Sequence, residues 1–161
     1  MIERFQVDTL SVMVSRMTKV SIAIIISDYY KKISEGLIAG AKDYCNENNL
    51  SYKTYSVVGA LEIAGAIKII SDKSLDNSFD GYVALGCVIR GETSHFDIVI
   101  NESSRALTNL TLNNSLIIGN GILTVENEEQ AISRSLKNNN NNKGYHAAHA
   151  CHDLISLRKS L

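Results

Sequence analysis

The chain has 161 residues, of which 45% are hydrophobic and 20% charged, and its formal net charge is −1. These values predict one soluble globular domain, and the charge provides no electrostatic basis for binding nucleic acid or an anionic membrane. The longest apolar run, residues 22–26, is too short to span a bilayer, and charged residues near the N-terminus interrupt any signal-peptide pattern. Cys45, Cys87 and Cys151 are widely spaced, which fits free thiols in a reducing cytoplasm better than a disulfide framework.

The hydrophobic pattern alternates between strand-like and helix-like segments along the chain. It begins with a continuous run rich in Ile and Val, which is typical of a strand buried on both faces. Apolar residues then recur at every fourth position from Ile33 to Cys45, which indicates a helix that packs by one face. The same criteria predict strands at 19–27, 51–58, 80–89 and 115–124, and helices at about 29–48, 60–73, 94–112, 126–137 and 145–159.

Four successive strand–helix units predict an α/β three-layer sandwich, a flavodoxin-like fold with a four-stranded parallel sheet flanked by helices. Residues 1–18 lie outside this alternation, either as a disordered tail or as an N-terminal arm that pairs with a neighbouring subunit. We expect the arm, followed by a single domain at 19–161. The tract Asn138–Asn142 is expected to be a flexible loop. Ligands in such folds bind at the carboxyl ends of the strands, here Ser27–Tyr30, Val58–Glu62, Gly86–His95 and Asn120–Val125.

The stretch GCVIRGETSHFD changes abruptly from an apolar strand to a polar cluster. Gly91 allows unusual backbone angles or the close approach of a ligand. Thr93 or Ser94 can cap the next helix, and Ser94 with Asp97 approximates a capping box. Free N–H groups at a helix start suit a phosphate, and His95 beside them can transfer protons near neutral pH. The stretch therefore predicts an anion site with acid–base chemistry, although the same residues could serve only as an ordinary helix cap.

Four segments of the chain, in order, resemble the lumazine synthase family. Residues 84–96, ALGCVIRGETSHF, resemble the family's ALG-VIRG-T-HF. Residues 57–68, 119–134 and 142–150 resemble its VPGAFEIP--AK, G-LT---EQA--R and NKG--AA-A, so the resemblance covers about 19–160. Members of this family condense 5-amino-6-(D-ribitylamino)uracil with 3,4-dihydroxy-2-butanone 4-phosphate to 6,7-dimethyl-8-ribityllumazine, the precursor of riboflavin. The resemblance implies the same reaction here, with no metal or organic cofactor.

The resemblance also implies roles for individual residues. His95 matches the proton-transferring histidine, and Tyr29 stands where the family has an aromatic residue stacked on the pyrimidine ring. Glu62 would accept a ribityl hydroxyl, and Arg134 would reach the phosphate from a neighbouring subunit. The residues expected to contact the ring and the ribityl chain are Tyr29, Gly59, Ala60, Leu61, Glu62, Cys87, Val88, Ile89 and Asn120. Those expected to contact phosphate are Gly91, Glu92, Thr93, Arg134 and Lys143.

The chain departs from the family pattern at several positions. Leu61 replaces the usual Phe, which weakens stacking there, and Asn120 replaces a common Phe at the subunit boundary. The tract before Lys143 is longer than the common pattern, so either Lys137 or Asn138 takes the place of a family lysine in that loop. Family members form pentamers, some of which build larger assemblies. The resemblance implies active sites at the subunit interfaces of such a pentamer, and the longer tract predicts that the pentamer stays isolated, as a homopentamer.

A second class of function shares the same fold. A non-catalytic protein that binds flavin or lumazine would need Tyr29 and Glu62 but would not need His95 or Arg134. All of these residues are present, together with the loop expected to bind phosphate, so the enzyme is the favoured interpretation. Its expected partners are its own subunits and small-molecule substrates.

The histidine series near the C-terminus suggests a metal site only at first sight. His146, His149 and His152 follow a three-residue spacing. On a helix of 3.6 residues per turn, the outer two lie about 120° apart around the axis. Imidazoles spread in this way do not converge on one ion, so we expect no metal there and instead a solvated or subunit-facing surface. Cys87 lies within an apolar strand, and we expect it to behave as a small buried hydrophobic residue instead of a nucleophile.

Overall fold

The structure, a computed structural model, describes residues 19–73, 79–137 and 140–161. It contains a four-stranded sheet in the order β2-β1-β3-β4, and every pair of neighbouring strands is parallel. The strands are β1 (Ser21–Ser27), β2 (Ser51–Val57), β3 (Gly81–Ile89) and β4 (Ile118–Val125). The helices are α2 (Lys31–Glu47), α3 (Glu62–Lys73), α4 (His95–Asn114), α5 (Glu128–Ser135) and α6 (Lys143–Ser160). The predicted α/β fold with a four-stranded parallel sheet is confirmed.

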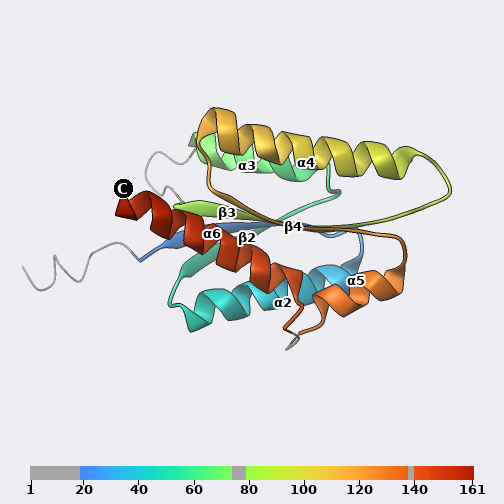
Figure 1. Cartoon of the computed structure of the whole chain (residues 1–161), viewed down its shortest axis with the longest axis horizontal. Helices are drawn as coiled ribbons and strands as arrows, with labels where there is room; N and C mark the ends of the chain where they lie inside the picture. Colours follow the sequence, from blue (N-terminus) through green and yellow to red (C-terminus); the bar gives the residue numbers. More distant parts are fainter. Residues whose placement is uncertain (1–18, 74–78, 138–139) are drawn as a thin grey trace, which may run out of the picture.

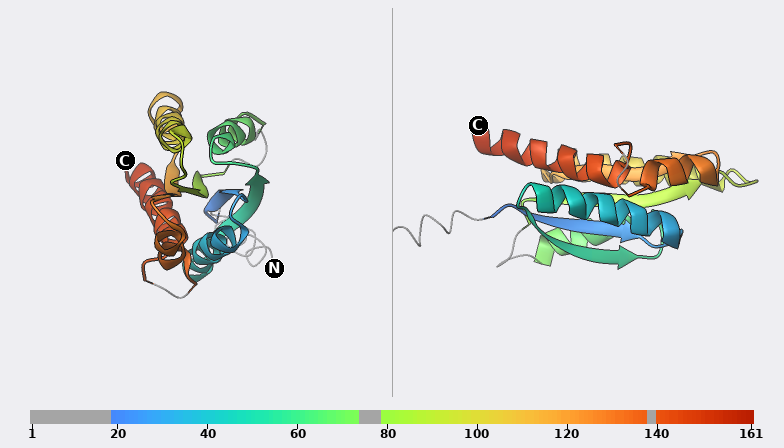
Figure 2. Two further views of the ribbon diagram at one scale, coloured as in Figure 1. Left: turned by 90° about the vertical axis from the view of Figure 1, so that its right-hand side faces the viewer. Right: turned by 90° about the horizontal axis from the view of Figure 1, so that it is seen from below.

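Helices cover both faces of the sheet and give the molecule three layers. Helices α3 and α4 lie on one face, and α2, α5 and α6 lie on the other (Figures 1 and 2). Alternate residues of β1 point to opposite faces, as the pleat of a strand requires. Ile24 packs in the core beneath α2 and α6, whereas Ile25 packs in the core beneath α3, and both are fully buried. This two-sided burial accounts for the continuous apolar run at the start of the alternation.

Strand β4 differs from its prediction in both start and character. It begins at Ile118, because α4 continues to Asn114 and Ser115 then adopts a left-handed conformation with φ of 54°. Its glycines do not interrupt it. A Cβ atom at Gly119 would collide with the carbonyl oxygen of Ala147 on α6. Glycine therefore lets α6 pack directly against the strand. This packing explains why the strand has glycine at position 119, although glycine otherwise weakens strands.

The expectation of a flexible loop at Asn138–Asn142 is wrong at its last residue. Asn142 is only 2% exposed and caps α6, since its side-chain oxygen accepts hydrogen bonds from two backbone N–H groups at 2.9 and 3.1 Å. Its amide nitrogen donates to the carbonyls of Gly36, Ser135 and Leu136 at 3.0–3.1 Å. Asn142 therefore joins α2, α5 and α6, and α6 begins two residues before its predicted start.

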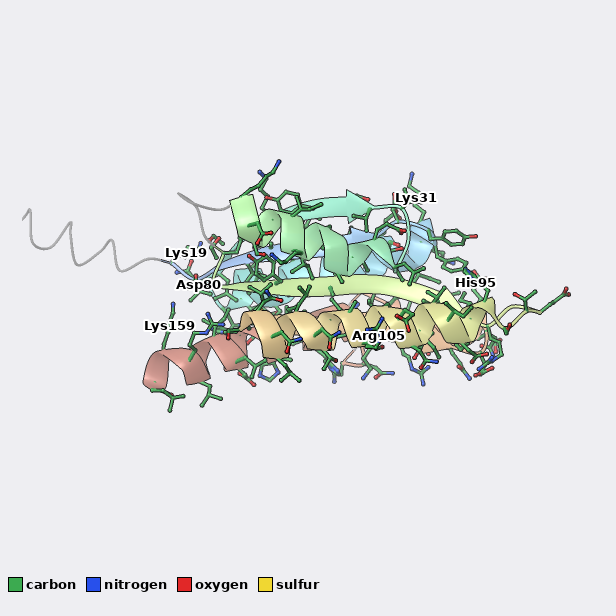
Figure 3. All side chains as sticks on the ribbon, turned by 90° about the horizontal axis from the view of Figure 1, so that it is seen from above. Lys19, Lys31, Asp80, His95, Arg105 and Lys159 are labelled. Atoms are coloured by element: carbon green, nitrogen blue, oxygen red, sulfur yellow. The ribbon has the colours of Figure 1, made fainter. Side chains whose placement is uncertain are left out.

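The two ends of the sheet differ in chemistry. At the amino-terminal end of the strands, the Asp80 carboxylate accepts the Ser21 N–H at 2.8 Å and pairs with Lys159 at 3.4 Å. Figure 3 shows His95 at the opposite end, where the parallel strands have their carboxyl ends. That end is where side chains of several connecting segments meet and where the candidate site lies.

Two further expectations concern the whole chain. The predicted arm at 1–18 lies outside the described residues, so the division of the chain at residue 18 stays a prediction. Among the residues that the structure describes, no helix has both the length and the apolar character needed to cross a membrane.

Candidate active site

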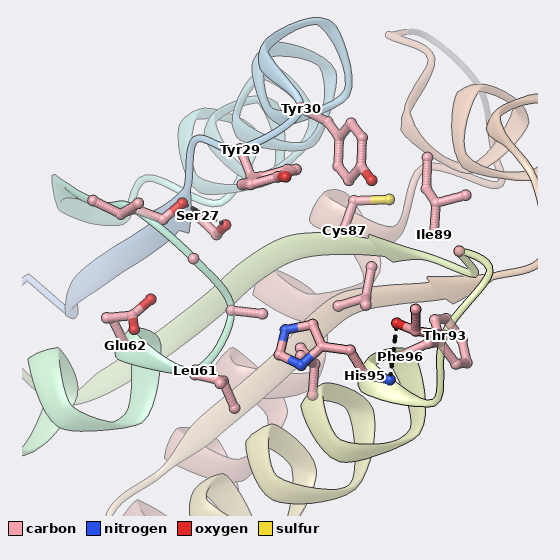
Figure 4. Close-up of a pocket in the computed structure, with 16 residues that line it drawn as sticks. Ser27, Tyr29, Tyr30, Leu61, Glu62, Cys87, Ile89, Thr93, His95 and Phe96 are labelled. Atoms are coloured by element: carbon pink, nitrogen blue, oxygen red, sulfur yellow. Dashed lines mark hydrogen bonds between the residues drawn. The ribbon is translucent and has the colours of Figure 1, made fainter.

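A cleft of about 390 Å³ opens at the carboxyl ends of β1, β2 and β3, beside the first turn of α4 (Figure 4). The strand order explains its position, because β1 and β3 are neighbours whose following connections leave toward opposite sides of the sheet. All the predicted site residues line this cleft except Glu92, Asn120, Arg134 and Lys143. Its lining residues are Ser27, Tyr29, Tyr30, Val58, Gly59, Ala60, Leu61, Glu62, Cys87, Val88, Ile89, Gly91, Thr93, His95, Phe96 and Val99.

The last residues of β3 contribute an apolar wall to the cleft. Cys87 is 5% exposed, and burial raises the pKa of its thiol to about 11. The thiol is therefore protonated at neutral pH and lacks the thiolate that a nucleophile needs. Val88 and Ile89 follow it and are half-buried. The expectation that Cys87 is a small buried residue is confirmed, and this wall suits a flat, largely apolar ring.

The turn between β1 and α2 places two tyrosines at the cleft. Tyr29 is 70% exposed, and its ring meets the ring of Tyr30 edge-on, with centroids 5.0 Å apart and an interplanar angle of 70°. This contact leaves the Tyr29 ring exposed to solvent at the edge of the cleft (Figure 4). Burial, followed by the neighbouring Tyr29, raises the pKa of the Tyr30 phenol. The pair provides an aromatic surface beside the apolar wall, although stacking of a substrate on Tyr29 stays a prediction.

The turn between β2 and α3 brings backbone and a carboxylate to the same cleft. Glu62 is the first residue of α3, where the positive end of the helix dipole favours a carboxylate. Its side chain folds back over Gly59, since a Cβ atom built there would lie 2.7 Å from the carboxylate Oε2. Glu62 and Leu61 are both exposed. The carboxylate is therefore accessible to the hydroxyl groups of a ligand, and the neighbouring glycine leaves room for it.

The connection between β3 and α4 corrects the predicted capping box. Ser94 has helical angles, φ of −67° and ψ of 0°, and its side chain makes no capping hydrogen bond. The Asp97 carboxylate instead pairs with Arg90 at 3.4 Å. Thr93 Oγ1 accepts the His95 N–H at 3.4 Å, so Thr93 is the residue that partly caps this helix. His95 itself is exposed and begins the helix, with its imidazole at the cleft (Figure 4).

Gly91 has no conformational reason to be glycine. Its φ is not positive, so the first of its two predicted uses, an unusual backbone angle, is wrong. A Cβ atom at Gly91 would also meet nothing within 4 Å in the described part of the chain. The close approach of a ligand to the backbone remains as a physical reason for glycine at this position. The next residue, Glu92, is exposed and does not line the cleft.

The remaining predicted residues line a separate hollow of about 450 Å³ between β4, α5 and α6. Arg134 donates to the Gln130 carbonyl at 2.9 Å and to the Ser133 hydroxyl at 3.3 Å, and no carboxylate of the described residues forms an ion pair with it. Lys143 Nζ lies 3.3 Å from His146 Nδ1. We call this site the cationic hollow; its lining residues are Asn120, Gly121, Ile122, Leu123, Thr124, Val125, Arg134, Lys143, His146, Ala147 and Ala150.

A single subunit therefore does not gather the residues expected to contact phosphate. Gly91 and Thr93 line the cleft, whereas Arg134 and Lys143 line the cationic hollow. Of the two alternatives for the earlier loop lysine, Lys137 is exposed, and residue 138 lies outside the described residues.

The three histidines of α6 make separate contacts. His146 Nε2 lies 2.8 Å from the Asn140 carbonyl oxygen, and His149 pairs with Asp153 at 3.2 Å. His152 Nδ1 lies 3.0 Å from the Tyr44 hydroxyl. Across the described ranges, no group of three or more potential metal ligands comes together.

Several lining residues were not among those predicted from the sequence. In the cleft they are Ser27, Tyr30, Val58, Phe96 and Val99, and in the cationic hollow the polar ones are Thr124 and His146. Helical spacing signals two of them. Val99 lies four residues after His95, and His146 lies three residues after Lys143, so each shares a helix face with a predicted residue. The strand-end rule had already included the segments that contain Ser27, Tyr30 and Val58.

Comparison with known proteins covers both sites. The family model for 6,7-dimethyl-8-ribityllumazine synthase matches residues 19–159. A protein of that name from Bartonella tribocorum is 51% identical over 141 residues, which make up 88% of this chain and 91% of the relative. One from Agrobacterium fabrum is 48% identical over 148 residues, covering 90% of this chain and 99% of the relative. The cleft and the cationic hollow lie entirely within the matched segment.

Proposed function

Because the chain belongs to the 6,7-dimethyl-8-ribityllumazine synthase family, we propose that its cleft and its cationic hollow are the two halves of one active site, each contributed by a different subunit. The chain is an enzyme of riboflavin biosynthesis. It condenses 5-amino-6-(D-ribitylamino)uracil with 3,4-dihydroxy-2-butanone 4-phosphate to give 6,7-dimethyl-8-ribityllumazine, and the reaction releases phosphate and water.

The observation that carries the site assignment is that three successive strand–helix connections bring different chemistries to one cleft. Tyr29 supplies an aromatic ring, Glu62 a carboxylate and His95 an imidazole, around the apolar wall at the end of β3. In the proposed complex the pyrimidine stacks on Tyr29 and lies along the backbone of residues 87–89. Glu62 accepts a ribityl hydroxyl. An exposed carboxylate suits this role because its two oxygens can exchange hydrogen bonds from water for hydrogen bonds from the hydroxyl groups.

The same arrangement suits the chemistry of the condensation. The uracil amine attacks the butanone carbonyl to form an imine with loss of one water, phosphate is eliminated, and the ribitylamine closes the second ring with loss of a second water. Each step moves a proton, and His95 at the cleft is the side chain proposed to carry it. Most of the rate enhancement is expected from holding the two substrates in register, since fixed orientation removes a large entropic barrier. The Gly91–Thr93 backbone lies beside His95 and is the proposed phosphate cradle of the cleft.

The charge of the second substrate supports a site made by two subunits. Its phosphate is anionic, yet none of the described residues that line the cleft is lysine or arginine. The cationic hollow supplies Arg134, which has a fork that matches phosphate geometry, and Lys143. We propose that these residues and Asn120 reach the cleft of a neighbouring subunit. Repetition of one such head-to-tail contact closes a ring, here a homopentamer, with the arm at 1–18 adding to a neighbour's sheet edge.

The cysteines support a cytoplasmic location for this enzyme. Cys45, Cys87 and Cys151 are all free and buried. Burial raises the pKa of their thiols to about 11, 11 and 12 respectively. Free, protonated thiols of this kind are typical of proteins in a reducing compartment, where cysteines do not form disulfides.

A turnover assay with both purified substrates tests the proposed function. The expected result is the appearance of the lumazine chromophore together with release of one phosphate per product formed. The His95→Ala variant is the matched control, because it keeps the ring-binding residues and removes the proposed proton carrier. A wild-type protein that binds the lumazine but forms none from the two substrates would instead be a binding protein on this fold.

A further inference from the structure

Arg90 follows β3 directly, and its guanidinium contacts two other segments beside the cleft. Its Nε donates a hydrogen bond of 2.8 Å to Glu126, which follows β4. Its terminal nitrogens approach the Asp97 carboxylate at 3.4–3.5 Å. Its Cζ lies 4.1 Å from the centroid of the Phe96 ring, within the range of a cation–π contact. One side chain therefore ties the ends of β3 and β4 to the first turn of α4.

The residues that Arg90 holds on α4 are the two that directly follow His95. Phe96 is 6% exposed and lines the cleft, and Asp97 lies in the same first helical turn. Because a helical side chain takes its direction from the backbone of its own turn, the orientation of this turn sets where the imidazole points. The turn also ends the loop at 91–94, whose Thr93 accepts the His95 N–H.

We infer that Arg90 is a positioning residue, which fixes the first turn of α4 and thereby places His95 and the preceding loop against the substrates. This inference rests on the role proposed above for His95. A guanidinium suits the task because its planar fork pairs with carboxylates and stacks on an aromatic ring, whereas a lysine ammonium is a flexible point charge. Arg90 stands beside the proposed phosphate loop, but Glu126 and Asp97 already balance its charge. We therefore assign it positioning and not phosphate binding.

Kinetics of Arg90→Gln and Glu126→Gln test the inference. Both variants loosen the same turn, so kcat should fall in both, by roughly 10- to 100-fold for Arg90→Gln, because a displacement of about 1 Å has effects of this size. KM for the aminouracil should stay within about twofold, since Tyr29 and Glu62 are untouched. The ion pairs are exposed, so the midpoint of thermal unfolding should shift by no more than about 4 °C.

A matched control separates positioning from a general loss of surface charge. Arg105 lies on the same helix and pairs with Glu102, and both side chains are exposed. Arg105→Gln should leave kcat within about twofold, because exposed pairs of this kind contribute little by themselves. Arg90→Lys should recover only part of the lost kcat, since it restores the charge without the planar fork.

Three outcomes would overturn the inference, and they are distinguishable. If Glu126→Gln lowers KM for the butanone phosphate, the freed guanidinium binds phosphate and Arg90 is a ligand instead. If Arg90→Gln keeps wild-type kcat while His95→Ala loses it, the proposed function stands and only the positioning role fails. If wild-type protein forms no lumazine from the two substrates, the proposed function fails first, and the role of Arg90 fails with it.

Discussion

The cleft and the cationic hollow divide between them the chemistry that one condensation needs. The cleft holds an aromatic ring, a carboxylate and an imidazole against an apolar wall, but no lysine or arginine is among its described lining residues. The hollow holds Arg134, Lys143 and His146, but no acidic residue is among its described lining residues. Neither region alone suits a substrate that is both a ketone and a phosphate ester. This difference is the basis of our proposal that the complete site takes residues from two copies of the chain.

The two regions occupy different parts of the sheet. The cleft lies at the centre, where β1 and β3 are neighbours and their connections diverge. The hollow lies along β4, which is an edge strand of the described sheet, and is bounded by α5 and α6. A site at a sheet edge faces outward, where a neighbouring subunit can reach it. Four predictions test this division, in order of decreasing effect.

Removal of the imidazole should have the largest effect, because it takes the proton carrier out of the cleft. In His95→Ala we expect kcat to fall by roughly 10- to 10⁴-fold, the range of general acid–base catalysis. Folding should be unchanged, since His95 is exposed. His149→Ala, which changes an exposed histidine paired with Asp153 on α6, is the matched control for steady-state kinetics. Unchanged turnover in His95→Ala would remove this residue from the mechanism.

Removal of the guanidinium from the hollow should affect one substrate more than the other. In Arg134→Ala we expect KM for the butanone phosphate to rise by roughly 10- to 100-fold, the worth of charge-assisted hydrogen bonds. KM for the aminouracil, which the cleft is proposed to hold, should change much less. Arg158→Ala is the control, because Arg158 is exposed and donates to the Ser115 carbonyl. Equal weakening of both substrates would mean that the hollow does not serve the phosphate.

Two glycines separate a requirement for ligand binding from a requirement of the fold. A methyl group at Gly91 meets no described atom within 4 Å, so Gly91→Ala should keep wild-type stability but weaken inhibition by inorganic phosphate several-fold. A methyl group at Gly144 would collide with the Leu37 carbonyl oxygen, so Gly144→Ala should lower the free energy of unfolding by about 1–3 kcal/mol. Calorimetry measures the stability of both variants, and titration with phosphate measures its inhibition of each. If phosphate inhibits Gly91→Ala as strongly as it inhibits the wild-type protein, the proposed phosphate cradle at Gly91–Thr93 would be contradicted.

The smallest effect is expected at Cys87, whose thiol serves only as part of the wall. Cys87→Ala should leave kcat within about twofold, because a thiol with a raised pKa is neutral under assay conditions.

The raised pKa of the Cys87 thiol also predicts how the stability of the protein changes at alkaline pH. The native thiol, with a pKa of about 11, holds its proton at pH values where an unfolded thiol, near 9, releases it. Stability from this group is therefore present below pH 9 and is lost as the pH rises toward 11. Alkaline unfolding of Cys87→Ala and wild-type protein measures the difference.

Much of the fold was predictable from local patterns, because burial leaves a period in the sequence. The continuous run in β1 predicts burial on both faces, and the four-residue spacing in α2 predicts its buried side. The strand order does not follow from such patterns, since any of several pairings buries the same residues. Asn142 shows the limit most clearly. Its place within a polar tract predicts a loop. It becomes a buried cap only through contacts that the tract does not reveal, with Gly36, which is distant along the chain, and with Ser135, which precedes the tract.

The candidate site was predictable to a similar degree. The strand-end rule and the motif around His95 indicate a cleft at the correct end of the sheet, where the structure brings Tyr29 and Glu62 together with it. The partner of Asp97 was not predictable, because Ser94 satisfies the capping pattern in the sequence while Arg90 takes the carboxylate in space. The roles of the site residues stay predictions, which the variants above test.

Mixed oligomers test the central claim most directly. Subunits carrying His95→Ala and subunits carrying Arg134→Ala are co-expressed with different tags, and oligomers that contain both are purified. If each site takes His95 from one subunit and Arg134 from its neighbour, random 1:1 mixing restores about a quarter of the sites, because both contributors must be intact at one interface. The account predicts that the mixed oligomers turn over substrate far faster than either parent variant. Turnover no greater than the mean of the two parents would contradict it.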